Sequence, residues 1–341
     1  MQHSTVIAAD IAKHSFQCAR FSNGRALRGN HNYSRRKFES LLHADKPFTL
    51  IMESCSGAQH WARLAKANGH EAILVPPKAV ASVRQGQKTD ANDALAIFDV
   101  ANSVNFKPAI QKDLDTQSLQ SLTTIRRHYQ DEKTRLNNAL RGHLSEYGLV
   151  FAKGQASLKR ALPDILEDAD NGLPHCLRDP LHRLWQDWLQ ADQHVTELTQ
   201  KLTDRLNTLP VARDLMALAG VGPINAAGLL CALGDGQAFK NGKQAGAFIG
   251  TAPKQYSTGG KVTQTGIDRR SGHTVLRANL VQGAWSVLLK IKARGPVSDT
   301  ERWLRALSER RGERKAVIAM ANKTVRQAWA IINQHHHTAH S

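Results

Sequence analysis

The sequence predicts an α/β domain followed by mostly helical domains. Short apolar strands alternate with amphipathic helices as far as about residue 105, and apolar residues recur in steps of three and four beyond it. The length of 341 residues leaves room for two or three domains. We predict four divisions: 1–108 as the α/β domain, 109–209 as a helical linker, 210–335 as a C-terminal domain and 336–341 as a flexible tail.

The first domain begins with three strands joined by short connections. Residues 5–12 form a buried strand, 15–24 form a second that ends in an Asn23-Gly24 turn, and 25–33 form a third. Such short connections predict an antiparallel meander. A helix, a strand, a helix, a strand and a last helix follow at 37–44, 48–54, 58–70, 71–77 and from about 90. This order of elements is typical of a ribonuclease-H-like fold.

The linker carries an apolar seam in its second half. The seam residues are Leu181, Leu184, Trp188, Ala191, Val195, Leu198, Leu202 and Leu209. Their spacing favours a coiled coil, within one chain or between chains, and the alternative is a helix packed on its own domain. A segment over 154–180 with three prolines is expected to separate two helical stretches.

The C-terminal domain begins with a helix-hairpin-helix pattern over 215–235. Gly220 and Gly222 would let backbone N–H groups approach a phosphate at a helix N-terminus, and the alternative is a plain turn between helices. Residues 252–277 are polar, basic and rich in glycine, and we predict a loop region there. Two helical stretches complete the chain.

The charge is strongly and unevenly basic. The chain has 46 Lys and Arg against 29 Asp and Glu, a net charge of +17, and the segment from residue 251 to the end holds 16 basic and 5 acidic residues. This imbalance favours a polyanionic partner, most simply nucleic acid. The basic residues are spread over loops and helices rather than along one amphipathic helix, which disfavours a membrane surface.

Three further features predict a cytoplasmic protein. No run of 18 apolar residues is present, so no membrane span is expected. The N-terminus lacks a basic segment followed by an apolar stretch, so no secretory signal is visible. The four cysteines are scattered without CxxC spacing, which argues against a zinc module or a disulfide framework.

Two aspartates stand three residues apart in KTDANDALAI, residues 88–97. Three apart on a helix is one face, so Asp90 and Asp93 place like charges side by side at the start of a predicted helix. One explanation is capping, because acids in a first turn suit the helix dipole. The other is a cation site, because carboxylates on one face bind Mg²⁺.

Two more acids support the cation site. Asp10 lies at the end of the first apolar strand, and Glu53 lies at the end of the strand over 48–54. In a ribonuclease-H-like sheet these strands are neighbours, and the helix with Asp90 and Asp93 packs beside them. Two Mg²⁺ ions, with Mn²⁺ as the alternative, would remove the repulsion among four convergent carboxylates. The result would be a two-metal site for phosphodiester chemistry.

Six motifs, in this order, resemble the DEDD transposases of bacterial insertion sequences, the group also called bridge-RNA-guided or seeker-RNA-guided recombinases. They are AADIAKHSF, MESCSG, KTDANDA, GVGPINAAGLL, FIGTAPKQYSTGGK and GIDRRSGHTVLR. The resemblance runs from about residue 5 to 332. It implies a RuvC-like N-terminal domain, a coiled-coil linker and a C-terminal domain with a nucleophilic serine.

The matching motif places that nucleophile in Tyr256-Ser257-Thr258-Gly259-Gly260. Many relatives carry two serines where this chain has Ser257-Thr258. We choose Ser257, whose primary hydroxyl is the less hindered nucleophile, and hold Thr258 in reserve. Nearby cations would neutralise the phosphate under attack. These are Lys254, Lys261, Arg269 and Arg270, with Arg277 as a further phosphate contact.

The resemblance also implies partners. Relatives act as dimers and tetramers on donor and target DNA, so a homodimer or homotetramer is expected, with acids of one subunit meeting the serine of another. A structured non-coding RNA would guide the protein by base pairing. We therefore expect an RNA-guided DNA recombinase of an insertion sequence. The alternatives are a RuvC-like Holliday-junction nuclease that activates water, and a nucleic-acid-binding protein without catalysis.

Overall fold

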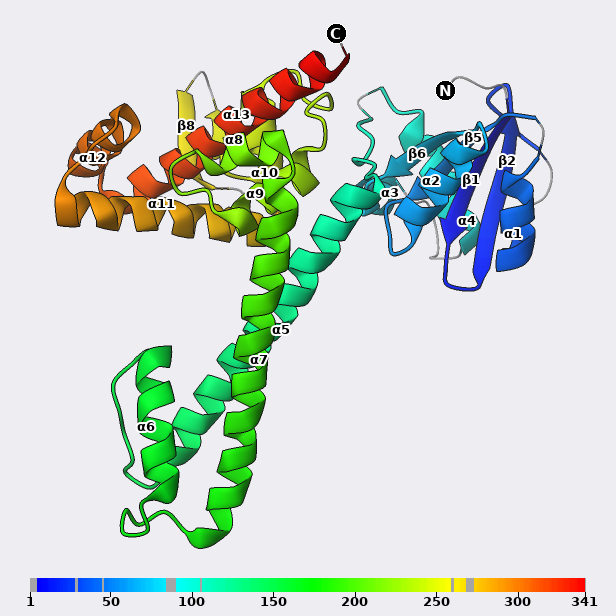
Figure 1. Ribbon diagram of the computed structural model, residues 1–341. Helices are drawn as coiled ribbons and strands as arrows, with labels where there is room; N and C mark the ends of the chain where they lie inside the picture. Colours follow the sequence, from blue (N-terminus) through cyan, green and yellow to red (C-terminus); the bar gives the residue numbers. More distant parts are fainter. Residues whose placement is uncertain are drawn as a thin grey trace. The chain divides into compact units, whose positions relative to one another are not determined.

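The computed structural model describes residues 5–27, 30–44, 46–83, 90–104, 106–258, 261–267 and 273–340. Of residues 90, 91, 254–258, 261–265 and 340 it describes the backbone only. The chain divides into two compact units, Met1–Leu114 and Asp115–Ser341 (Figure 1).

The first unit is built on one mixed sheet. Its strands are β1 (Thr5–Ile11), β2 (Ser15–Ser22), β3 (Arg25–Ala26), β4 (His31–Ser34), β5 (Thr49–Glu53) and β6 (Glu71–Val75). The order is β3-β2-β1-β5-β6, and β4 also pairs with β2. β1 and β2 are antiparallel, whereas β1–β5 and β5–β6 are parallel. The predicted meander is therefore confirmed, and the mixed α/β sheet is compatible with a ribonuclease-H-like domain.

The third predicted strand is wrong in one respect. Residues 25–33 do not form one strand but contribute to two short ones, β3 and β4, which both lie antiparallel to β2. Arg25, Ala26 and Leu27 are exposed, so the apolar side chains at the start of this segment are not buried against the core. Without that burial, little favours a long continuous strand at the edge of the sheet.

Helices cover both faces of the sheet. One face packs against α1 (Arg35–Leu42) and α2 (Ala58–Ala67), where the ring of Phe16 stacks on Phe38 at 4.5 Å and meets the edge of Trp61 at 5.1 Å. The other face packs against α3 (Pro77–Val83) and α4 (Asp90–Ala101). Successive side chains of each strand lie on opposite faces of the sheet, as the pleat of a strand requires.

The second unit begins with two long helices, α5 (Leu114–Ser145) and α7 (His175–Asn207), which lie side by side (Figure 1). Arg126 of α5 donates to Thr199 of α7 at 2.6 Å. The expected break over 154–180 holds a third helix, α6 (Gln155–Glu167). Pro163 and Pro180 lie inside helices rather than ending them. Packing outweighs the lost hydrogen bonds there, because Leu158 and Leu162 of α6 are fully buried in a cluster with residues of α5 and α7.

The apolar seam of α7 is buried largely as predicted. Its buried residues are Leu181, Trp185, Trp188, Ala191, Val195, Leu202 and Leu206. Trp185 and Leu206 belong to this face and were missed, whereas Leu209 lies beyond the helix, as the N-cap of α8. The geometry of a coiled coil stays a prediction.

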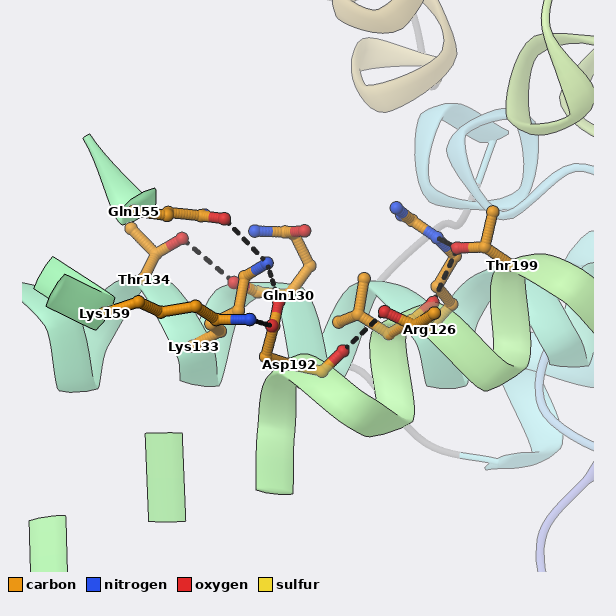
Figure 2. A network of polar contacts seen from close by, with 10 residues as sticks. Arg126, Gln130, Lys133, Thr134, Gln155, Lys159, Asp192 and Thr199 are labelled. Atoms are coloured by element: carbon orange, nitrogen blue, oxygen red, sulfur yellow. Dashed lines mark hydrogen bonds and ion pairs between the residues drawn. The ribbon is translucent and has the colours of Figure 1, made fainter. Parts of the chain in front are cut away.

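A network of polar side chains joins α5, α6 and α7 (Figure 2). Lys133 of α5 is only 5% exposed and donates to Asp192 of α7 at 2.9 Å and to Gln155 of α6 at 3.2 Å. Lys159 reaches the other carboxylate oxygen of Asp192 at 2.7 Å. Burial raises the pKa of Asp192, but the hydrogen bonds from Lys159 and Lys133 outweigh it and hold this pKa below its ordinary value.

Replacing Asp192 by asparagine should therefore destabilise the chain. The change leaves the buried Lys133 without its anion and should lower the free energy of unfolding by about 2 kcal/mol at neutral pH. Because the folded-state pKa of Asp192 is depressed, its contribution is present above the ordinary pKa of an aspartate and is lost as the pH falls through the folded value. Urea melts at neutral and acidic pH measure both effects. Asp187→Asn, an exposed site on the same helix, is the control, and an equal loss in both variants would refute the network.

The rest of the second unit is a helical module with one strand pair. It comprises α8 (Pro210–Met216), α9 (Pro223–Leu233), α10 (Gly242–Ile249), β7 (Pro253–Thr258), β8 (Lys261–Ile267), α11 (Thr274–Arg294), α12 (Asp299–Arg311) and α13 (Glu313–His340). Its core joins α11 to α12 and α13 through buried residues such as Leu288, Leu304 and Val317. No helix within the described ranges combines the length and the apolar character that a bilayer crossing requires.

One prediction for this module is wrong. Residues 253–258 and 261–267 form the antiparallel pair β7–β8 rather than a loop. The β-forming residues Tyr256, Val262 and Thr263 favour strands, and only Gly259 and Gly260 separate the paired Thr258 and Lys261 in sequence. The flexible tail from 336 stays a prediction, and α13 continues through it to His340. Just before the tail, His335 contacts Asp214 of α8 at 2.7 Å.

Candidate functional site

Asp10 and Glu53 lie next to each other at one edge of the sheet. The parallel register pairs Ala9 of β1 with Met52 of β5, so the next residue on each strand is an acid. Ala8 and Ile51, two residues earlier, belong to the face that α4 covers. Since strand residues two apart share a face, both acids lie on the α4 side of the sheet. Both are half-buried.

Helix α4 brings the third acid to this face. Asp93 is only 6% exposed, and the next residue, Ala94, packs in the same cluster as Ala8 and Ile51. Asp90 is the first residue of α4, one turn before Asp93, and its side chain lies outside the described residues. A carboxylate that caps a helix can remain exposed to solvent. Capping alone therefore does not explain why Asp93 is buried against the sheet.

Cys55 is a neighbour of this site that the sequence did not single out. Its Sγ donates to the carbonyl oxygen of Ile11 at 3.7 Å. Burial raises the pKa of the Cys55 thiol, and the negative charges of Glu53 and Asp10 raise it further. Both carboxylates therefore lie close enough to the Cys55 thiol to act on it. The signal in the sequence was the position of Cys55, two residues after Glu53.

The donor chemistry of this face suits a hard divalent cation. Carboxylate oxygens are the ligands that Mg²⁺ and Mn²⁺ prefer, and a cation would offset the mutual repulsion of the acids. Within the part of the chain that the structure describes, no three His, Cys, Asp or Glu side chains form a group that could hold a metal ion. Binding of a metal by Asp10, Glu53, Asp90 and Asp93 therefore stays a prediction.

The candidate serine belongs to the second unit. Ser257 and Thr258 end strand β7, with Lys254 earlier in the same strand and Lys261 at the start of β8. The backbone of Ser257 pairs with Val262. Arg269 and Arg270 lie outside the described residues. The candidate nucleophile, Lys254 and Lys261 are therefore placed only as far as the hairpin backbone.

Gly220 packs against α11, and its expected phosphate contact stays a prediction. Its φ is +80°, and a Cβ there would lie 2.8 Å from the carbonyl oxygen of Gly283 in α11. Asn225 of α9 donates to the carbonyl oxygens of Gly220 and Asn279, at 3.1 and 3.3 Å. The turn between α8 and α9 is thus pressed against α11, which explains Gly220 without a ligand. Gly222 is the N-cap of α9, and a Cβ there would meet open space.

Arg277 is also not where a phosphate contact was expected. It lies in the first turns of α11 but is only 8% exposed, beside the buried Leu276 and Leu280. Arginine stems often cover apolar surface, but a guanidinium that reads DNA must reach solvent. A direct contact of Arg277 with the DNA backbone stays a prediction.

Comparisons with known proteins find transposases similar to nearly the whole chain. A family model described as transposase of the IS116/IS110/IS902 family matches residues 212–296. A second model, of the DEDD transposases of IS110 type, matches residues 7–149 and so includes Asp10, Glu53, Asp90 and Asp93.

Three relatives are similar over nearly their full lengths. The transposase for insertion sequence element IS1111A of Coxiella burnetii is 30% identical over 98% of this chain and 91% of its own. The transposase for insertion sequence element IS1328 of Yersinia enterocolitica is 30% identical over 98% of both chains. A probable family 20 transposase of Pseudomonas aeruginosa is 29% identical over 96% of both. With this identity and coverage, the chain belongs to the IS116/IS110/IS902 family of transposases.

Proposed function

We propose that this transposase cuts and rejoins DNA through a serine–DNA intermediate, at carboxylates that bind Mg²⁺. The observation that supports this most is the neighbouring position of Asp10 and Glu53 on the face of the sheet covered by α4, the helix that carries the buried Asp93. Carboxylates at one edge of a sheet repel one another, and a bound cation would offset that repulsion.

Each acid has a defined part in this proposal. Asp10, Glu53, Asp93 and Asp90 would hold the metal, which supplies charge neutralisation and polarisation of the phosphate oxygens. Asp93 reaches the site from a helix rather than a strand, so the packing of α4 on β1 sets its distance from the other two. Asp93 is buried, and Asp10 and Glu53 are half-buried, so charge interactions at this face are stronger than in open water.

Ser257 is the proposed nucleophile. Its Oγ loses a proton and forms a bond to phosphorus, while the bond from phosphorus to one bridging oxygen breaks and that strand end leaves as a hydroxyl. Attack of another strand's hydroxyl on the phosphoserine then reverses the step and frees Ser257. One phosphodiester bond is exchanged for another, and no water is consumed.

The proposal also includes a guide RNA. The strongly basic balance fits a protein that holds nucleic acid by its backbone, and only 6% of residues are aromatic, which leaves few side chains for base stacking. A structured non-coding RNA would pair with donor and target DNA and so supply the sequence specificity. The active form would be a homodimer or homotetramer, with the acids of one subunit serving the serine of another.

A covalent-trapping assay tests the nucleophile. The protein is incubated with Mg²⁺, the element's non-coding RNA and labelled donor DNA, then denatured and separated on a gel. We expect a protein–DNA adduct that is lost in Ser257→Ala and kept in Thr258→Ala, since Ser257 carries the attacking oxygen. Leaving out the RNA should also abolish the adduct.

The matched pair of variants separates the alternatives. Loss of the adduct in Thr258→Ala alone would move the nucleophile by one residue. Cleaved DNA without an adduct in any variant would favour a junction nuclease that activates water. Neither cleavage nor an adduct under any condition, with DNA binding intact, would favour a binding protein without catalysis.

A further inference from the structure

The second unit contains a groove beside the hairpin that carries Ser257. Its volume is about 1100 Å³. Trp303 and Leu307 of α12 line one side, α13 forms the floor, and Pro253 and Ile267, the paired residues at the base of β7–β8, form another wall. Small-molecule pockets have volumes of about 300–1,000 Å³, so the lining of this groove, and not its size, indicates the ligand.

The groove is lined by cations. These are Arg311 at the end of α12 and Lys315, Lys323 and Arg326 of α13. No Asp or Glu is among its lining residues, and none of the four forms an ion pair with a carboxylate that the structure describes. Two other cations of α12 are neutralised, since Arg302 pairs with Asp299 and Arg305 with Glu309. The four lining cations leave the groove positively charged.

The aromatic residue of the groove orients one of these cations. The ammonium of Lys323 lies 4.5 Å from the centre of the Trp303 ring. Such a cation–π contact holds the side chain across the groove while the charge remains available to an anion. Trp303 itself packs against the core of the module, so its ring is a support for Lys323 rather than a platform for a base.

The spacing of the cations fits a nucleic acid strand. Lys315 and Arg326 are three turns apart on α13, about 16 Å along its axis. One strand of B-DNA places about five phosphates along that length. Successive phosphates of one strand could each meet one of the cations spread along this face of α13. A single small anion would meet only one or two of them.

We propose that this groove binds the phosphodiester backbone of the DNA strand that is cut, and holds it against the β7–β8 hairpin. The choice of DNA rests on the proposed function, because the hairpin that forms one wall also carries Ser257. The groove reads charge and not sequence, which suits an enzyme whose specificity comes from an RNA.

The test is DNA binding by the full-length protein, measured by fluorescence anisotropy over a series of salt concentrations. Ser257→Ala protein in buffer without Mg²⁺ is used throughout, so that no cutting occurs. The added double variant Lys315→Gln with Arg326→Gln should weaken binding of labelled donor DNA roughly tenfold at low salt. It should also reduce the salt slope by about 1.8, which is about 0.9 for each lost phosphate contact. Binding of the non-coding RNA should not change.

The matched control is Arg302→Gln with Arg305→Gln, which removes the same charge from the ion-paired cations of α12. Equal losses of DNA affinity in the two double variants would overturn the proposal, because total charge and not the groove would then explain binding. A loss of RNA affinity with DNA affinity unchanged would overturn it too and assign the groove to RNA. The proposed serine chemistry fails separately, through a missing adduct in the trapping assay, and this binding result does not depend on it.

Discussion

Asp10→Asn is expected to abolish DNA cleavage while the protein stays folded. The substitution keeps the size of the side chain and removes one negative charge from the edge of the sheet where Asp10 and Glu53 adjoin. Transition-state stabilisation by a bound metal is worth several kcal/mol, so cleavage should fall on the order of 10³-fold or more. The adduct of the trapping assay, followed over time, measures this rate.

The same variant gives a readout that does not depend on catalysis. In the wild type, Mg²⁺ should raise the melting temperature, because an ion that binds only the folded state stabilises it. Asp10→Asn should melt at a higher temperature than the wild type without Mg²⁺, because a repulsion has been removed, and should gain little from added Mg²⁺. Asp99→Asn, an exposed acid on α4, is the control and should behave like the wild type in both assays. An unchanged response to Mg²⁺ in Asp10→Asn would refute the carboxylate site.

Gly283→Ala is expected to destabilise the second unit strongly. A Cβ at this position would overlap the carbonyl oxygen of Gly220 and lie 3.1 Å from the side-chain nitrogen of Asn225. Neither atom can move alone, because Asn225 ties the turn before α9 to α11 through the carbonyl oxygens of Gly220 and Asn279. Overpacking of this kind costs about 3 kcal/mol, and thermal denaturation should show a melting temperature about 10 °C lower.

A second glycine serves as the matched control. Gly142 lies inside α5, and a Cβ there would meet no atom within 4 Å. Gly142→Ala should therefore raise the free energy of unfolding by about 0.5–1 kcal/mol, since alanine favours a helix. If Gly283→Ala lowers the free energy of unfolding and Gly142→Ala raises it, then steric contact, and not helix propensity, decides the effect at Gly283. A Gly283→Ala protein with wild-type stability would contradict the close packing of α11 on this turn.

The first unit could be predicted in most respects because its signals are local. Apolar runs separated by short turns fix the order of the strands, and an acid at the end of each of two such runs stands out. Asp10 and Glu53 therefore reach the same edge of the sheet, as expected. The sequence does not show how deeply each side chain is buried. The burial of Asp93 follows from the packing of α4 on the sheet.

The second unit was less predictable because its signals come from contacts distant in the chain. Gly220 belongs to a glycine pattern typical of phosphate binding, yet its partner is Gly283, 63 residues later. Arg277 was expected to contact phosphate because it follows the serine segment and opens a helix, and it is buried by the packing of α11. The hairpin over 253–267 is different, since its two-residue Gly-Gly connection was a local signal, outweighed by the polar composition around it.

The division of the chain into two units has a consequence for the life of a mobile element. All four candidate acids precede Leu114, and the hairpin with Ser257 comes more than 130 residues later. Under the proposed chemistry, a ribosome that stops early releases a product with every acid and no nucleophile. Such a fragment would be unable to form the serine–DNA bond. Under that chemistry only translation products that extend past the hairpin would recombine DNA, so the order of the two units would limit recombination to the longer products.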